Sequence, residues 1–79
     1  MRVRISAFVG PLTVQFEPSG MEYELAEGDH LDVAFPPVPE GQVGGHIDHS
    51  PGMVTVSESI SSKGWTRAWN AAGEEITTY

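Results

Sequence analysis

The stretch from residue 12 to residue 25, LTVQFEPSGMEYEL, decides the fold class. Apolar and polar side chains alternate over residues 12–16 and again over residues 21–25, and this spacing of two is typical of half-buried strands. The segment Pro18-Ser19-Gly20 between them has turn chemistry, because proline presets φ and glycine tolerates positive φ. The stretch therefore predicts a β-hairpin.

The same pattern recurs along the rest of the chain, where short strand-like runs are separated by turn residues. The runs lie at residues 2–8, 12–16, 21–25, 30–35, 46–49, 53–57, 64–69 and 74–79. Such runs at intervals of about 8 to 12 residues are typical of sandwiches and small barrels. We expect an all-β fold over residues 1–79: a small single-domain β-sandwich or partly open β-barrel of roughly six to eight short antiparallel strands.

Residues 36–45 break the pattern. Prolines and glycines fill most of this segment, as Pro36, Pro37, Pro39, Gly41, Gly44 and Gly45. A strand ladder does not survive three prolines, so we expect an extended loop. A loop of this length in so small a domain is either functional or mobile.

The charge of the chain narrows the class of partner. The 79 residues include 4 Lys and Arg against 11 Asp and Glu, which gives a formal net charge of −7. Neither nucleic acid nor an anionic membrane attracts such a chain, and we expect neither as a partner. Another protein is the partner we expect, and a basic surface on it would suit this charge, because opposite charge speeds association.

Segments that address a protein to a membrane are not expected here. No run approaches the roughly 20 apolar residues of a membrane-spanning helix, and no apolar run follows the basic residues 1–5 as a signal peptide requires. The sequence contains no cysteine, which excludes disulfides and thiolate metal sites. We expect a cytoplasmic protein.

The acidic residues are unevenly distributed. Six of the eleven lie between Glu17 and Asp32, whereas Arg2 and Arg4 lie on the first predicted strand. We therefore expect the first strand to pair beside the acidic hairpin, with cross-strand charge pairs that each contribute a few tenths of a kcal/mol.

Trp65, Arg67 and Trp69 share one face of a predicted strand, with Thr66 and Ala68 on the other. An arginine between two indoles stacks on aromatic faces, and exposed Trp and Arg are typical of interface hot spots or of a platform for a sugar ring. In the competing interpretation, the tryptophans cover the core and Arg67 pairs with an acid of the Glu22 and Glu24 strand. We predict that the Trp-Arg-Trp face anchors a protein partner, with Glu22 and Glu24 setting its orientation; a homodimer that buries this face is equally consistent with the sequence.

The three histidines are the alternative site. His30, His46 and His49 flank the proline-rich segment, with Asp29, Asp32 and Asp48 close to them in sequence. Imidazole and carboxylate together suit Zn, Ni or Fe(II), which would make the protein a metal or small-ligand binding β-barrel. On one strand His46 and His49 point to opposite faces, so they bind one metal only where the backbone bends. Exposed polar loop residues are the simpler interpretation, and we expect no cofactor.

The sequence contains only weak matches to the motifs of catalytic sites. Residues 57–63 combine Ser, Glu and Lys without a Gly-x-Ser-x-Gly elbow, and the glycines of residues 41–45 have no following helix or Lys-Ser/Thr to hold a phosphate. We expect a protein that is not an enzyme. A third hypothesis is a phage-type inhibitor that mimics DNA, which needs carboxylates spaced like phosphates along one face.

The chain also resembles short β-rich proteins of actinobacteria and their phages. The resemblance is carried by the first amphipathic strand, the turn at residues 27–31 and the hairpin at residues 69–74. It spans most of the length and implies no activity.

Overall fold

The computed structural model describes residues 2–59 and 64–79, and these residues are all strand, turn or loop. The all-β prediction is confirmed, and the described residues include no helix that is long and apolar enough to cross a membrane. The described strands are β1 (Arg2–Ser6), β2 (Leu12–Glu17), β3 (Met21–Leu25), β4 (His30–Ala34), β5 (Gly45–Ser50), β6 (Met53–Glu58), β7 (Arg67–Asn70) and β8 (Glu75–Ile76).

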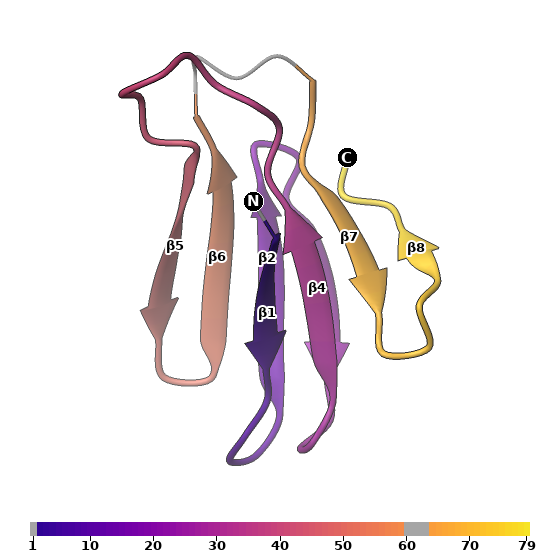
Figure 1. Ribbon diagram of the computed structural model, residues 1–79. Coiled ribbons are helices and arrows are strands. Elements are labelled where there is room, and N and C mark those ends of the chain that lie inside the picture. The colour runs from indigo at the N-terminus through magenta and orange to yellow at the C-terminus, as the bar shows by residue number, and fades with distance from the viewer. Residues whose placement is uncertain (1, 60–63) are drawn as a thin grey trace.

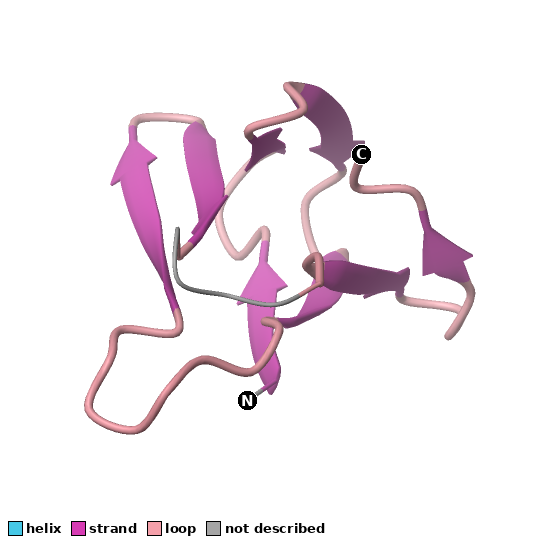
Figure 2. Cartoon of the chain, turned by 90° about the horizontal axis from the view of Figure 1, so that it is seen from above, coloured by secondary structure: helices cyan, strands magenta, loops and turns pink. Residues whose placement is uncertain are grey.

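The strands form two four-stranded sheets (Figure 1). The first sheet has the order β1-β4-β7-β8, and the second has the order β3-β2-β6-β5. Figure 2 shows the strands from above, standing around a shared interior. The predicted hairpin is present as β2 and β3, which pair in antiparallel fashion from Leu12 opposite Leu25 to Phe16 opposite Met21.

One strand pair corrects the expectation of a purely antiparallel fold. β2 and β6 are parallel, with Val14 opposite Val54 and Phe16 opposite Val56. Parallel neighbours need a long crossover connection, which here consists of β3, β4 and β5. The alternation within a strand is the same for both kinds of pairing, so the local sequence does not reveal the direction of a distant neighbour.

The expected position of the first strand is also wrong. β1 pairs with β4, with Arg4 opposite Asp32 and Ile5 opposite Leu31, and not with the β2–β3 hairpin. The chain changes sheet between β1 and β2, and the pairing of β1 is extended by the hydrogen bond from the Ala7 amide to the Asp29 carbonyl, at 2.9 Å. Arg4 still meets a carboxylate of the acidic region, but on the strand after the hairpin.

A single hydrophobic cluster fills the space between the sheets. Every strand from β1 to β4, with β6 and β7, contributes its inward-facing side chains to the buried set Ile5, Ala7, Val14, Phe16, Leu25, Leu31, Val33, Phe35, Val56 and Ala68. Burial of such side chains contributes about 25 cal/mol per Å² of apolar surface removed from water. Apolar and polar residues thus alternate along the strands because one side of each sheet faces this core and the other side faces solvent.

The proline-rich segment is a loop, as expected, and it occupies residues 35–44. Its two ends meet, because a Cβ atom on Gly45 would lie 2.4 Å from Cδ1 of Phe35. The ring of Phe35 therefore packs directly on the Gly45 backbone, where a larger residue does not fit. This contact holds the two ends of the loop together.

Candidate protein-binding surface

The predicted strand over residues 64–69 begins later than expected, since β7 carries Arg67 and Trp69 whereas Trp65 lies in the segment before it. Ala68 is fully buried in the core and Thr66 is buried beside it, so Trp65, Arg67 and Trp69 project away from the core. The interpretation in which both tryptophans cover the core is not the arrangement in the structure. The small side chains of the strand face inward instead.

Trp69 is half-buried between two guanidinium groups. The Cζ atom of Arg2 lies 4.2 Å from the indole centroid, and that of Arg67 lies 5.0 Å from it. Both distances are in the range of a cation–π contact. Arg67 therefore stacks on Trp69, while Trp65 packs elsewhere.

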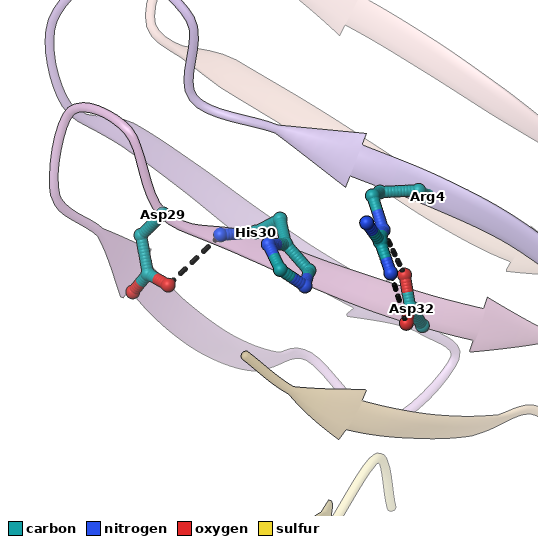
Figure 3. Close-up of polar contacts among 4 residues, drawn as sticks. All are labelled: Arg4, Asp29, His30 and Asp32. Carbon is teal, nitrogen blue, oxygen red and sulfur yellow. Dashed lines mark hydrogen bonds and ion pairs between the residues drawn. The ribbon is translucent and has the colours of Figure 1, made fainter. Parts of the chain in front are cut away.

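Two bidentate ion pairs flank Trp69 on the outer face of the first sheet. Arg67 donates to both carboxylate oxygens of Glu75, at 2.6 and 2.9 Å, so its partner is the adjacent strand and not Glu22 or Glu24. Arg4 donates to both oxygens of Asp32, at 2.7 and 3.1 Å (Figure 3). These pairs hold the strands in register at the surface.

The ion pairs change the titration of their carboxylates. Hydrogen bonds from Arg4 lower the pKa of Asp32, and hydrogen bonds from Arg67 lower the pKa of Glu75. A carboxyl with a lower pKa in the folded state contributes stability above its unfolded pKa, and this contribution is lost as the pH falls through its folded pKa. Both pairs are solvent-exposed, so their individual contributions are small.

We expect the free energy of unfolding of the variant Asp32→Asn/Glu75→Gln to depend less on pH than that of the wild type. The difference should fall between pH 5 and pH 2, about the range in which carboxyls titrate. Urea unfolding at a series of pH values measures this slope. Glu22→Gln is the matched control, because Glu22 is exposed on β3 and forms no ion pair among the described residues. Equal slopes for the double variant and the wild type would contradict the assignment.

Trp65 forms an exposed aromatic pair with Tyr79. Their ring centroids lie 5.8 Å apart with an interplanar angle of 69°, which is an edge-to-face contact. Trp65 is 55% exposed and Tyr79 is 72% exposed. A depression of about 340 Å³ is lined by these two residues.

An apolar hollow adjoins the aromatic pair. Its volume is about 290 Å³, and it lies between the start of the proline loop and the segment before β7, with Ala34, Phe35, Pro36, Pro37, Gly64, Trp65 and Arg67 as its lining. A further depression of about 350 Å³ shares Phe35, Pro36 and Pro37 with it. Trp65 belongs to the first two depressions, so it connects the aromatic pair to the proline loop.

Hydrogen bonds on neighbouring residues fix the aromatic pair in place. The Thr66 amide donates to Glu58, and the Thr66 carbonyl accepts from the Thr78 hydroxyl. Ser19 donates to the Thr78 carbonyl at 2.6 Å, which joins this segment to the turn between β2 and β3. The residues next to Trp65 and Tyr79 are therefore anchored, while both rings stay accessible.

The two glutamates proposed to orient a partner lie on the other sheet. Glu22 and Glu24 are exposed on β3, an edge strand of the second sheet, and Glu24 accepts a hydrogen bond of 2.6 Å from Thr13. Their side chains point away from the core on the second sheet, whereas Arg67 and Trp69 do so on the first. The structure does not bring these glutamates to the Trp-Arg-Trp face.

The three histidines are likewise divided between the sheets. His30 lies at the start of β4, where its amide donates to the Asp29 carboxylate at 2.9 Å (Figure 3). His46 and His49 lie on β5 of the second sheet, and Nε2 of His46 lies 3.3 Å from Oδ2 of Asp48. Residues 2–59 and 64–79 contain no group of three His, Cys, Asp or Glu that could hold a metal ion. Of the serine-rich segment 57–63, residues 60–63 lie outside the described residues.

Sequence reasoning missed Tyr79 and the role of Phe35, Pro36 and Pro37. The prolines gave a signal, since they marked the loop, but nothing in their spacing pointed to Trp65. Tyr79 gave none, because its contact with Trp65 depends on where the segment after β8 packs.

Comparisons of the chain with protein-family models, with curated proteins and with solved structures gave no match.

Proposed function

We propose that the protein is a small acidic protein-binding module without catalytic activity of its own, and that a partner binds over the aromatic pair and the apolar hollow. The observation that carries this proposal is the exposure of Trp65. More than half of its surface, 55%, is open to solvent, although its neighbour Thr66 is buried. An indole held open beside an apolar hollow gains from burial by a partner.

The composition of the surface supports a protein as the partner. Trp, Tyr and Arg are the residues most enriched among interface hot spots, and Trp65, Tyr79 and Arg67 lie together here. The hydrogen bonds at Thr66 and Thr78 limit how much ordering a partner must supply, and a preorganised site binds more tightly for that reason.

The shape and charge favour an extended, basic segment. Shallow apolar depressions lined by aromatic and proline side chains accommodate polyproline II segments, which present side chains at regular intervals. The net charge of −7 adds attraction for lysine or arginine beside the docked residues. We therefore propose a proline-containing segment with flanking basic residues.

Within this proposal the other residues have different roles. Arg67 lies at the rim of the hollow, where its pairing with Glu75 keeps its guanidinium fixed beside the partner. Trp69 is covered by two arginines and supports this rim rather than inserting into the partner. Glu22 and Glu24 act through the long-range field that steers a basic segment towards the protein, because they lie on the other sheet.

Selection from a random peptide library tests the proposal. Wild type is the bait, and the affinity of each selected peptide is then measured for Trp65→Ala and for Phe8→Ala, an exposed aromatic truncation in the β1–β2 connection at the other end of the molecule (Figure 1). We expect Trp65→Ala to weaken binding by about 30-fold, the effect of a hot-spot residue, and Phe8→Ala to leave it unchanged. Both variants should unfold at nearly the wild-type temperature, because neither side chain is in the core.

Two outcomes would contradict the proposal. Selection of no peptide would reject an extended segment as the partner. Selected peptides that bind Trp65→Ala as tightly as wild type would place the site elsewhere on the molecule.

A further inference from the structure

β5 is an edge strand without the usual protection against pairing. It pairs with β6 in an unbroken register from Gly45 opposite Glu58 to Ser50 opposite Met53, and no other described strand lies on its far side. Natural edge strands are commonly shortened, bulged or equipped with proline or lysine. β5 has six residues, no bulge in this register, and neither proline nor lysine.

The other edges differ from β5 in length or charge. β8 has only two residues, β1 carries Arg2 and Arg4, and β3 carries Glu22 and Glu24. In each of the two longer strands, like charges at alternate positions would repel a second copy aligned across the edge. On β5 the alternating side chains are complementary and not alike, since the imidazole of His46 and the carboxylate of Asp48 share one face, with 3.3 Å between Nε2 and Oδ2.

The apolar side chain of β5 is incompletely covered. Ile47 lies opposite Val56, a core residue that is 1% exposed, yet Ile47 itself is 37% exposed. Among the described residues, β5 has no neighbouring strand on the side away from β6. A further strand beside β5 would cover Ile47 and extend the core.

The alternation of an antiparallel ladder limits how two copies of β5 can pair. In an antiparallel ladder, two opposed residues either both direct their N–H and C=O groups towards the partner strand or both direct them away from it. In a two-fold symmetric pair, one residue must therefore lie opposite its own equivalent in the other copy. Centring on Asp48 places two carboxylates opposite each other, and centring on His46 does the same for two imidazoles. Centring on Ile47 places each His46 opposite the Asp48 of the other copy, and each Ile47 opposite its equivalent.

We propose that the protein forms a symmetric dimer in which β5 of two copies pairs in antiparallel fashion about Ile47. The two second sheets then become one continuous sheet. The chemical complementarity of this register, with imidazole opposite carboxylate, favours a second copy as the occupant of the edge, because a single strand supplies both partners of each His–Asp pair. β5 lines neither the aromatic pair nor the apolar hollow, so the dimer is independent of the proposed function.

Analytical ultracentrifugation of the full chain tests the dimer. We expect self-association with a dissociation constant between about 1 μM and 1 mM, since one strand pair is a small interface. The variant His46→Asp places two carboxylates opposite each other wherever position 46 of one copy meets position 48 of the other. The variant Asp48→Lys places an ammonium group opposite His46 at the same positions, which removes the attraction between imidazole and carboxylate. Each variant alone should weaken self-association by about tenfold or more.

An equimolar mixture of the two variants should recover association. In the mixed dimer, the carboxylate introduced in one copy faces the ammonium group introduced in the other. At the second pair, the unchanged Asp48 of the first copy faces the unchanged His46 of the second. A carboxylate therefore faces an ammonium group at one position and an imidazole at the other, whereas each variant alone opposes two carboxylates or two basic side chains at both positions.

The mixture is the most informative of these measurements, because association recovers in it only if position 46 of one copy lies opposite position 48 of the other. His46 and Asp48 are exposed, so the variants should keep the wild-type unfolding temperature, which verifies that the fold is intact. A wild type that stays monomeric at about 1 mM would overturn the proposal. So would a mixture that does not recover association, or a dimer that is unaffected by both variants and dissociates with Trp65→Ala, which would place the interface on the aromatic pair.

Discussion

Replacing Phe16 with alanine is expected to lower the free energy of unfolding by about 3–5 kcal/mol, the cost of removing a fully buried phenylalanine. Phe16 is among the largest fully buried side chains, and it contacts Tyr23 edge-to-face with 6.1 Å between ring centroids. It also lies on β2, which pairs with both β3 and β6. Its loss would leave a cavity at the centre of the second sheet.

The effect is large relative to the stability of so small a domain. At 0.05–0.15 kcal/mol per residue, a chain of 79 residues has about 4–12 kcal/mol in total. Urea unfolding followed by tryptophan fluorescence measures the difference. The control is Phe8→Ala, since Phe8 is 88% exposed and its truncation should change stability by no more than about 0.5 kcal/mol. Similar losses for the two variants would contradict the assignment of the core.

The second large effect is expected at Gly45. Alanine at this position would place its Cβ 2.4 Å from the ring of Phe35 and 2.9 Å from the Ser57 carbonyl, so one of these groups must move. Overpacking of this kind costs about 1–3 kcal/mol. We expect Gly45→Ala to lower the unfolding free energy by that amount and to displace the proline loop.

Gly44 provides a control one residue away. An alanine Cβ there would lie 3.9 Å from Val38, which is an ordinary contact. Gly44→Ala should therefore change the unfolding free energy by no more than about 0.5 kcal/mol. Equal losses of stability for the two variants would contradict the assignment of the cost to the contact with Phe35.

The elements of the fold were largely predictable because their signals are local. The alternation of Leu12, Val14 and Phe16 identifies a strand wherever that strand lies, and the turn residues mark its ends. The parallel pairing of β2 with β6 and the pairing of β1 with β4 depend on contacts between distant segments. Alternation is the same for every neighbour, so it carries no information about them.

The candidate site also combines features that local sequence predicts with features that depend on contacts between distant segments. The shared outward face of Arg67 and Trp69 follows from strand periodicity and could be predicted, whereas Trp65 lies before β7 and packs against Tyr79 instead. Which face points outward depends on the packing above β7, where the small side chain of Ala68 is fully buried. Tyr79 reaches Trp65 through the packing of the segment after β8, which local sequence does not specify. The division of the histidines between two sheets was hidden for the same reason.

An NMR titration of the isotopically labelled protein with a peptide obtained by selection tests most directly where the partner binds. If the partner binds over the aromatic pair and the apolar hollow, the largest shift changes will fall on the indole N–H of Trp65, on Tyr79, and on the amides of Ala34, Phe35 and Val38, since Pro36 and Pro37 between them have no N–H. Changes confined to β3, or to the β1–β2 connection around Phe8, would contradict the account and move the binding surface to another part of the molecule.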